Sequence, residues 1–315
     1  MSRSSRALAP LALATAAVTY ALVVLGSTVR VTESGMGCPG WPLCYGQLGP
    51  IDRFHAILEQ SHRYLVVVLT LLVLATAVAA WRQRRAVRVP ALAAVGIIVV
   101  QIVLGAVTVI THNAPYTVAL HLMTALLLLG TVVVTAVAAC TPARAAPPGR
   151  RRVGPLAWWT VAATYVLLLS GSLVVDGGAS YACPSWPVCG FGGQPWQLVL
   201  IQYVHRTLVL VAGTLMVLLV MRAARRWHGT GRGTRVIADL VAVGLLAQIA
   251  AGGLVATLGA PPALQDLHLA LAAGLWVGVV TLLAVGWQRA AAVPGTAPGG
   301  GRAELAVGGA PGITA

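Results

Sequence analysis

Apolar residues fill long uninterrupted runs along this chain, and polar residues gather in the short segments between the runs. A run of about 20 apolar residues is long enough for a helix to cross the roughly 30 Å hydrocarbon core of a bilayer. Eight such spans are predicted, at about residues 10–30, 58–81, 90–110, 117–139, 156–176, 199–221, 235–257 and 264–287. The first span follows two arginines, as the apolar core of a signal peptide would, but its length favours a full transmembrane helix. The pattern therefore predicts an all-α integral membrane protein with eight transmembrane helices.

The composition and the placement of charge agree with this topology. Of the 315 residues, 58% are apolar and only 9% are charged, whereas a soluble domain carries about 25% charged residues. The net charge of +14 comes from 21 arginines without a lysine, and 17 of these arginines lie at the termini or after the second, fourth and sixth spans. The positive-inside rule places this side in the cytoplasm, together with both termini. A basic chain could bind nucleic acid, but arginines confined to short connections do not indicate such a partner.

The two halves of the chain repeat one another. The segments CPGWPLC (38–44) and CPSWPVC (183–189) share the pattern C-P-x-W-P-x-C, 145 residues apart. Further pairs keep nearly this spacing: Gly26-Ser27 with Gly171-Ser172, His62-Arg63 with His205-Arg206, Gln101 with Gln248, Gly105 with Gly252, and His121-Leu122 with His268-Leu269. Because each unit holds an even number of spans, both units enter the membrane in the same direction and are related by a pseudo-two-fold axis along the membrane normal.

This repeat predicts the domain organisation. Two parallel four-helix bundles, residues 10–140 and 155–290, are joined by a cytoplasmic linker at 141–154 that is rich in arginine and proline. Residues 291–315 are rich in glycine, proline and alanine and are predicted to form a disordered cytoplasmic tail.

Four of the five cysteines fall in the two long loops on the outer face, one pair in each loop. In an oxidising compartment such pairs favour two disulfides, Cys38–Cys44 and Cys183–Cys189. A metal site is the alternative, although the Trp and Pro residues between the cysteines add no ligands. An exposed Cys38–Cys44 disulfide could exchange electrons with a thiol protein. The fifth cysteine, Cys140, lies at the cytoplasmic end of the fourth span and is expected to be an inert thiol.

Four histidines are matched by the repeat, namely His62, His121, His205 and His268. Each is expected about one turn inside the outer end of an even-numbered span, which places all four at nearly the same depth. Two helices of each half would then present one imidazole each to a common interior, as bis-imidazole ligation of a haem iron requires. Zinc would need three or four ligands, which the second half does not offer. The alternative for a lone histidine in a membrane is a hydrogen-bonded packing role.

Glu59 distinguishes the first half from the second, because its counterpart is Gln202. Glu59 stands one helical turn before His62, so the two side chains share a helix face. A haem that only carries electrons needs no carboxylate beside its ligand, whereas proton-coupled chemistry does, and we therefore predict a catalytic role for Glu59. The alternative is an ion pair with an outer-loop arginine such as Arg53.

Arg63 and Arg206 directly follow their histidines and are candidates to bind haem propionates near the outer surface. The alternative is that their side chains reach lipid phosphates. His55, His112 and His228 have no counterparts in the repeat and are expected to be solvated.

The eight spans, the duplicated unit, the four level histidines, the E-x-x-H-R motif at residues 59–63 and the cysteine pair in each long outer loop together resemble the haem A synthase family over about residues 10–290. The resemblance implies that a ring methyl of haem O is oxidised stepwise to the formyl group of haem A for cytochrome oxidase, ending in a gem-diol that loses water. It implies that His62 and His121 flank the substrate haem with Glu59 as the catalytic acid. It also implies that His205 and His268 ligate a permanent haem b.

The same resemblance implies partners. Haem O synthase and an electron acceptor are expected beside haem O and membrane lipid, and assembly into a homo-oligomer stays open. Two alternatives belong to other classes of protein. A dihaem b-type electron-transfer cytochrome would stack its haems at different depths. A small-solute transporter would have spans broken by glycine or proline with polar groups at the membrane midplane, whereas these spans are apolar and uninterrupted there.

Overall fold

The computed structural model describes residues 3–49, 52–141, 154–189, 194–226 and 232–291, and in this part the chain forms eight long α-helices and one short 3-10 helix. The long helices are α1 (Arg3–Val31), α2 (Phe54–Ala80), α3 (Arg85–Ile110), α4 (Pro115–Cys140), α5 (Pro155–Asp176), α6 (Trp196–Arg226), α7 (Arg232–Thr257) and α8 (Pro262–Ala291), and the 3-10 helix η1 (Ser34–Met36) follows α1. Each long helix is apolar enough to cross a membrane. The predicted all-α fold with eight spans is confirmed. The predicted tail and most of the predicted linker lie outside the described residues.

The helix starts and ends follow from local sequence. Proline opens three of the helices, at Pro115, Pro155 and Pro262, where its fixed φ suits the first turn and its missing N–H costs no bond. After α3 and α7 the backbone turns through left-handed residues at matched positions of the repeat, Asn113 (φ 57°) and Ala260 (φ 51°). Both connections on this side of the bundles therefore reverse the chain in a similar way.

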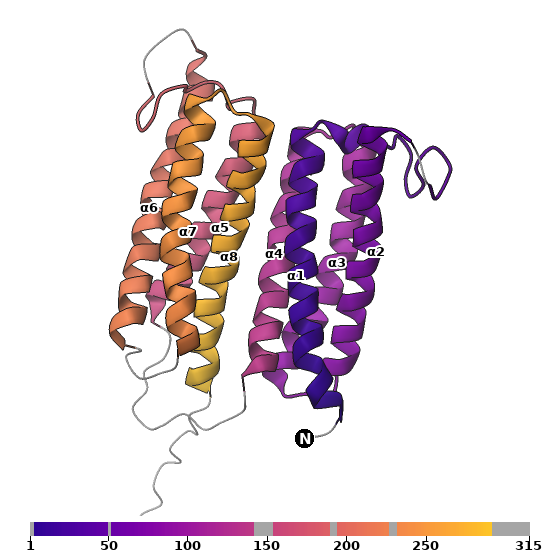
Figure 1. The fold of residues 1–315 in the computed structure, drawn as a ribbon, viewed down its shortest axis with the longest axis vertical. Helices are drawn as coiled ribbons and strands as arrows, with labels where there is room; N and C mark the ends of the chain where they lie inside the picture. The colour runs from indigo at the N-terminus through magenta and orange to yellow at the C-terminus, as the bar shows by residue number, and fades with distance from the viewer. Residues whose placement is uncertain (1–2, 50–51, 142–153, 190–193, 227–231, 292–315) are drawn as a thin grey trace, which may run out of the picture.

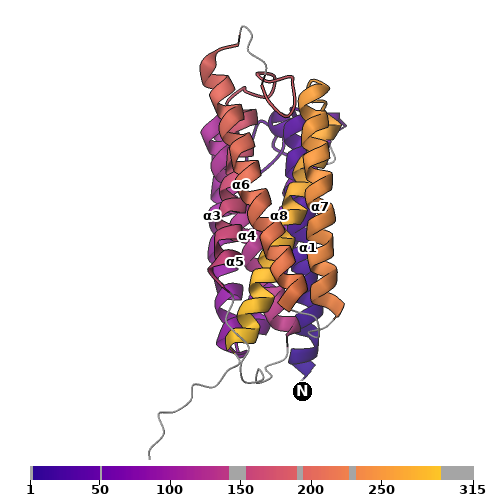
Figure 2. The same ribbon diagram turned by 90° about the vertical axis from the view of Figure 1, so that its left-hand side faces the viewer.

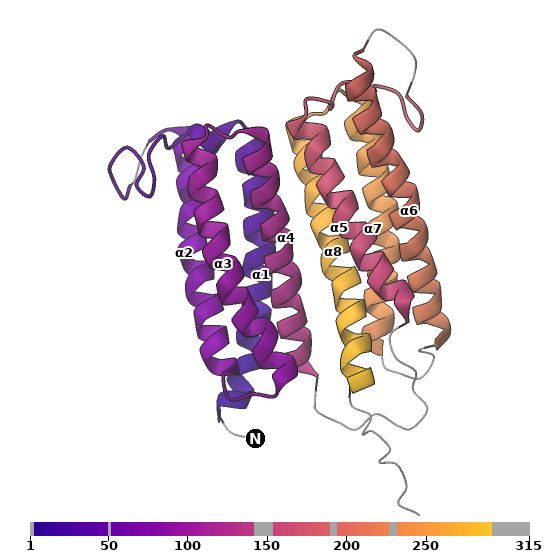
Figure 3. The same ribbon diagram turned by 180° about the vertical axis from the view of Figure 1, so that it is seen from behind.

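The helices form two four-helix bundles that lie side by side, α1–α4 and α5–α8 (Figures 1 and 3). Helices α1 and α4 of the first bundle meet α5 and α8 of the second, and Figure 2 shows the second bundle from its outer side. The loops α1–α2 and α5–α6, which carry the disulfides, lie at the end of the molecule opposite the start of α1 (Figure 1). Both cysteine loops connect an odd-numbered helix to the next even-numbered one, and both therefore lie at the same end of the molecule.

Aromatic side chains join the two bundles by bonds to main-chain carbonyls. Tyr20 on α1 donates its hydroxyl to the carbonyl of Ala270 on α8 at 3.0 Å, and Tyr165 on α5 donates to the carbonyl of Met123 on α4 at 3.1 Å. Trp276 adds an indole N–H bond to the carbonyl of Leu126 at 2.9 Å. Buried apolar residues of α1, α4 and α8 pack around these bonds, so the interface is a continuous core rather than a surface contact.

Charged groups also cross this interface near the loop end. Arg30 on α1 pairs with Asp176 on α5 at 2.5 Å, and Ser172 donates to the other carboxylate oxygen at 2.5 Å. Thr28 donates to Asp266 on α8 at 2.7 Å. The Asp176 side chain is only 6% exposed, so its carboxylate oxygens are bonded by these partners rather than by bulk water.

Tryptophans mark the two ends of the helices, where the headgroup region of a bilayer would lie. The exposed ones at the arginine-rich end are Trp81, Trp158, Trp159 and Trp287, and those at the loop end are Trp41, Trp186 and Trp196.

Candidate functional site

The four repeat-matched histidines lie on the four even-numbered helices, at the loop end of each bundle. His121 comes six residues after the start of α4 and His205 nine residues after the start of α6, which is roughly two turns. The predicted depth of one turn was wrong, because these helices begin a few residues earlier than the apolar runs. The histidines are therefore deeper in the bundles than expected.

The structure brings the histidines together in the predicted pairs. His62 and His121 lie close enough to interact electrostatically, and so do His205 and His268. Each pair belongs to one bundle.

A glycine on the preceding helix backs every one of these imidazoles. A methyl group on Gly26 would come within 3.1 Å of Cε1 of His62, and one on Gly252 within 2.9 Å of Cε1 of His268. The corresponding distances are 3.3 Å for Gly105 with His121 and 3.4 Å for Gly171 with His205. All four glycines are matched by the repeat, but the repeat alone does not indicate a role for them. The structure assigns one, since each glycine lets an imidazole approach the neighbouring helix closely, and the approach is tightest at Gly252 and Gly26.

The Nδ1 atoms point toward this glycine-backed side. In His62, His121 and His268 the Nδ1 atom is buried and has no hydrogen-bond partner among the described residues. The histidines as a whole are nevertheless partly exposed. Since their Nδ1 atoms are covered, the exposed part of these three residues lies elsewhere in each residue.

Glutamines at matched positions bind one histidine in each half. The Nε2 atom of Gln101 lies 3.1 Å from Nε2 of His121, and that of Gln248 lies 3.3 Å from Nε2 of His268. An amide N–H donates to the imidazole, so Nε2 carries the lone pair in both rings. A metal bound to these histidines would take this same lone pair.

The second half contains a contact that sequence reasoning missed. Ser170 Oγ lies 2.9 Å from Nδ1 of His205 and also donates to the carbonyl of Leu167 at 2.7 Å. The residue at the matched position of the first half, directly before Gly26, is Leu25. Because the repeat does not preserve this serine, no pattern in the sequence could identify it.

Glu59 and its counterpart Gln202 make different contacts. The Glu59 carboxylate accepts a hydrogen bond from Nε of Arg63 at 2.9 Å, one turn further along α2, and the residue is only 7% exposed. The alternative partner considered for it, Arg53, instead lies over the ring of Tyr45. Gln202 instead donates to the carbonyl of Ala179, in the loop between α5 and α6, at 2.8 Å. At this position of the repeat, only the first half carries a carboxylate.

The arginines that follow His62 and His205 hold the disulfide loops. Arg63 donates to the carbonyls of Cys38 at 3.1 Å and Gly40 at 2.7 Å, and Arg206 donates to those of Cys183 at 3.1 Å and Pro187 at 3.0 Å. These acceptors lie in the matched C-P-x-W-P-x-C segments, so the two loops are anchored in the same way. The predicted contact of these arginines with propionates stays a prediction.

Both predicted disulfides are present. Cys38 and Cys44 are bonded with their Cα atoms 4.7 Å apart, and Cys183 and Cys189 with theirs 5.0 Å apart. Cys140 is a free and exposed thiol.

The unmatched histidines lie outside the paired sites. His55 is exposed at the start of α2, although its Nδ1 bonds to Ser34 at 2.8 Å. His112 is exposed in the turn after α3. His228 lies outside the described residues.

The paired histidines fit a haem better than a bare metal ion. Within the described ranges, no group of three or more His, Cys, Asp or Glu residues could hold a metal, as a zinc site would require. A haem iron needs only two axial ligands from the protein. Each half offers two imidazoles in one bundle, and in three of the four rings Nδ1 is buried, so the donor set suits two bis-histidine haems.

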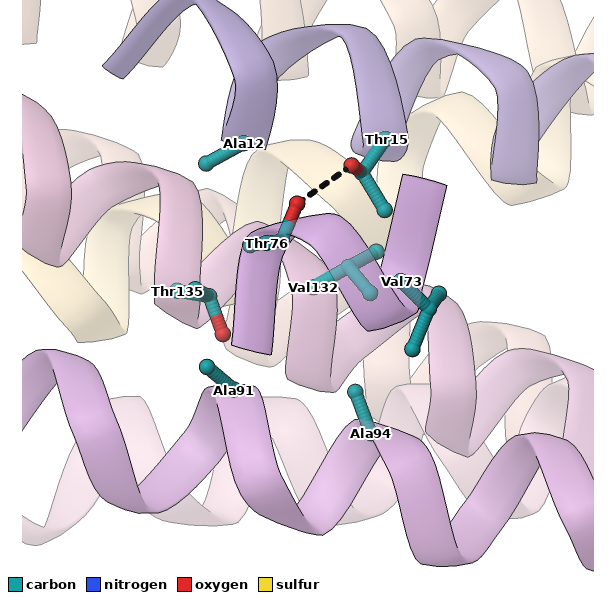
Figure 4. A pocket seen from close by; sticks show the side chains of 8 residues that line it. All are labelled: Ala12, Thr15, Val73, Thr76, Ala91, Ala94, Val132 and Thr135. Atoms are coloured by element: carbon teal, nitrogen blue, oxygen red, sulfur yellow. Dashed lines mark hydrogen bonds between the residues drawn. The ribbon is translucent and has the colours of Figure 1, made fainter. Parts of the chain in front are cut away.

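A small cavity lies in the first bundle, away from the histidines and toward the arginine-rich end. It is lined by Ala12, Thr15, Val73, Thr76, Ala91, Ala94, Val132 and Thr135 (Figure 4). Thr15 and Thr76 bond to each other across it at 2.8 Å. Four of the eight matched positions in the second half carry larger residues, and these belong to a packed core: Met216, Leu219, Val241 and Leu282. The first bundle is therefore less completely filled at this end.

Comparison with known proteins gives a consistent result. The sequence model of the cytochrome oxidase assembly protein family matches residues 9–56 and 52–280. Heme A synthase from Exiguobacterium sibiricum is 27% identical over 287 residues, which cover 87% of this chain and 94% of that protein. Heme A synthase from Halalkalibacterium halodurans is 32% identical over 215 residues, 64% of this chain and 70% of that protein. Heme A synthase from Exiguobacterium sp. is 30% identical over 241 residues, 74% of this chain and 79% of that protein.

The family match begins in α1 and ends in α8, so it includes both histidine pairs, Glu59 and both disulfide loops. The chain belongs to the cytochrome oxidase assembly protein family, the family of the haem A synthases.

Proposed function

We propose that this chain is a haem A synthase, an oxidoreductase that converts a ring methyl group of haem O into the formyl group of haem A. In this proposal His62 and His121 hold the substrate haem in the first bundle, and His205 and His268 hold a resident haem b in the second. Support comes from the family membership and from the two histidine pairs, each backed by glycines.

The observation that carries the proposal is the buried Glu59 carboxylate, whose counterpart in the second half is the neutral Gln202. Its Oε1 atom accepts the bond from Arg63, and within the described part of the chain its Oε2 atom has no hydrogen-bond partner. Oε2 is therefore the atom that can take a proton released from the substrate methyl group as it is oxidised, or stabilise positive charge there. Gln202 could do neither.

Arg63 positions this acid. Its guanidinium spans from Glu59 to the carbonyls of the Cys38–Cys44 loop, so carboxylate and loop are fixed to one another. A loop held over the site in this way would restrict the access of water to the substrate.

In the second half, His205 and His268 would hold haem b, which when bound supplies a one-electron carrier next to the reacting half. The protein holds the two bundles together through a packed core and main-chain bonds, which keeps the two sites at a constant separation.

We also propose a location and an orientation. The chain would span the cell membrane with its arginine-rich connections in the cytoplasm. The disulfide loops at the opposite end (Figure 1) would then face the oxidising outer side.

Glu59→Gln tests the role of the carboxylate, because it copies the residue of the second half at that position. Glutamine can still accept the bond from Arg63, and Arg63 keeps its bonds to the loop carbonyls, so the fold and haem binding should persist. Haem A formation should fall about 10²–10⁴-fold, the usual contribution of a general acid or base. Haem extracted from the purified variant would be identified by pyridine haemochrome spectra and mass.

Gln202→Glu is the matched control and should leave haem A formation unchanged. If Glu59→Gln makes haem A at the normal rate, Glu59 has no part in the chemistry. If the wild-type protein contains haem b at both sites and never haem O or A, the chain is instead a dihaem electron-transfer cytochrome.

A further inference from the structure

We infer that Ser170 makes His205 a permanent haem ligand, and that the lack of a hydroxyl at the matched Leu25 makes His62 the exchangeable one. This inference rests on the proposed function, since it assumes that each histidine pair holds a haem. It explains how two duplicated sites can hold one haem as a cofactor and release the other as a product.

The two contacts of the Ser170 hydroxyl favour one tautomer of His205. The serine has one hydroxyl hydrogen, and it is donated to the carbonyl of Leu167 at 2.7 Å. The bond of 2.9 Å between Ser170 Oγ and His205 Nδ1 must then use a hydrogen on Nδ1. Nε2 of His205 is left with its lone pair, which is the form that binds iron. Ser170 is buried, only 6% exposed, so water does not compete for this bond.

In the first half the corresponding ring lacks such a partner. Nδ1 of His62 is buried and has no hydrogen bond among the described residues. If Nε2 of His62 binds iron, Nδ1 carries a buried hydrogen without an acceptor, which weakens binding. Leu25, directly before Gly26, offers no polar atom where Ser170, directly before Gly171, offers a hydroxyl.

A hydrogen-bond acceptor at Nδ1 affects the binding and the reduction potential of the iron as well as the orientation of the ring. A hydrogen bond from the second nitrogen of a ligating histidine fixes ring orientation and raises the basicity of the ligand, and its loss commonly lowers metal affinity about 10- to 100-fold. A more basic imidazole stabilises the ferric state, so Ser170 should also hold the reduction potential of the second haem lower than it would otherwise be.

Ser170→Ala in the full-length, haem-loaded protein tests the inference without an activity assay. We expect haem b to transfer to excess apomyoglobin about 10- to 100-fold faster than from the wild type. In a redox titration its midpoint potential should become more positive. Ser170→Thr keeps a hydroxyl and should restore both properties toward the wild type.

Thr164→Ala is the matched control, because it removes another buried hydroxyl of α5, one that donates to the carbonyl of Thr160 at 2.6 Å. Its haem b transfer and potential should equal those of the wild type. If Ser170→Ala behaves like Thr164→Ala, the inference is overturned.

The reciprocal change gives independent evidence. Leu25→Ser should slow the loss of haem from the first half about tenfold relative to Leu25→Ala, which removes the same side chain without adding a hydroxyl. Equal haem loss from the two variants would contradict the proposed difference between the halves.

His205→Ala separates this inference from the proposed function. If His205→Ala loses haem b but Ser170→Ala does not weaken its binding, the inference fails alone. If His205→Ala keeps its full haem content, the proposed haem sites are wrong and the inference fails with them.

Discussion

The glycines behind the four imidazoles allow a graded test of the haem sites. Replacing each with alanine adds one methyl group, and the structure gives a different clearance in each case. In the second half the methyl would lie 2.9 Å from the His268 ring at Gly252 but 3.4 Å from the His205 ring at Gly171. The first distance is shorter than carbon atoms tolerate, whereas the second is an ordinary van der Waals contact. These two positions therefore form a matched pair around the proposed haem b site.

The expected magnitudes follow from these clearances. A methyl group forced into a packed site typically costs about 1–3 kcal/mol, which corresponds to roughly 5- to 150-fold in affinity. Alanine also favours the helix by about 1 kcal/mol relative to glycine. Gly252→Ala should thus displace the His268 ring and weaken haem b binding within that range, while Gly171→Ala should bind haem b normally and unfold at a slightly higher temperature.

Haem retention against apomyoglobin, the low-spin bis-imidazole spectrum and thermal unfolding in detergent would measure these effects. Gly96→Ala on α3 is the control, because a methyl group there meets no atom within 4 Å. The reasoning is refuted if Gly252→Ala retains haem b as well as Gly96→Ala does. It is equally refuted if Gly171→Ala loses as much haem as Gly252→Ala.

Three further predictions concern the framework of the site. Arg30→Met should destabilise the protein by about 3–5 kcal/mol in thermal unfolding, because the buried Asp176 carboxylate loses its charged partner. Asp176→Asn should reduce the unfolding free energy by less, since the Arg30 side chain is 30% exposed and can be hydrated. Equal losses would contradict this. Thr76→Leu, which copies Leu219 of the second half, should fill the first-bundle cavity and raise the unfolding free energy by about 1 kcal/mol, and a lower unfolding temperature would show that the cavity cannot accept the larger side chain. Arg63→Lys cannot keep bonds to both Glu59 and the loop carbonyls, so residues 38–44 should exchange amide hydrogens faster than in the wild type; unchanged exchange would mean that other contacts hold the loop.

The fold could be predicted because the membrane simplifies the pattern. A bilayer requires about 20 apolar residues per span and leaves arginines in the connections, so the eight helices were evident from run lengths. The helix starts were less predictable. Helix α2 begins at Phe54 rather than at about residue 58, because its first turn contains the polar His55, which an apolar run does not include.

The site was only partly predictable, for a different reason. The repeat identified His62 and its three equivalents, and the single substitution of Gln202 for Glu59 identified the asymmetry. A hydrogen bond from a side chain to the main chain of another segment leaves no such pattern in the sequence. The bonds from Arg63 to the loop carbonyls depend on how the loop folds back onto α2. Ser170 has no polar counterpart in the repeat, and from the sequence it cannot be distinguished from any other serine in an apolar helix.

The tyrosine bonds between the bundles bear on how such a chain could evolve. Tyr20 and Tyr165 occupy matched positions of the repeat, and the residues whose carbonyls they bind, Ala270 and Met123, are also a matched pair. The acceptor residues differ in side chain, yet the bonds are the same, because a main-chain carbonyl is present whatever the residue. An ancestral homodimer joined in this way could be fused into one chain, and each half could then mutate its interior freely without losing its partner.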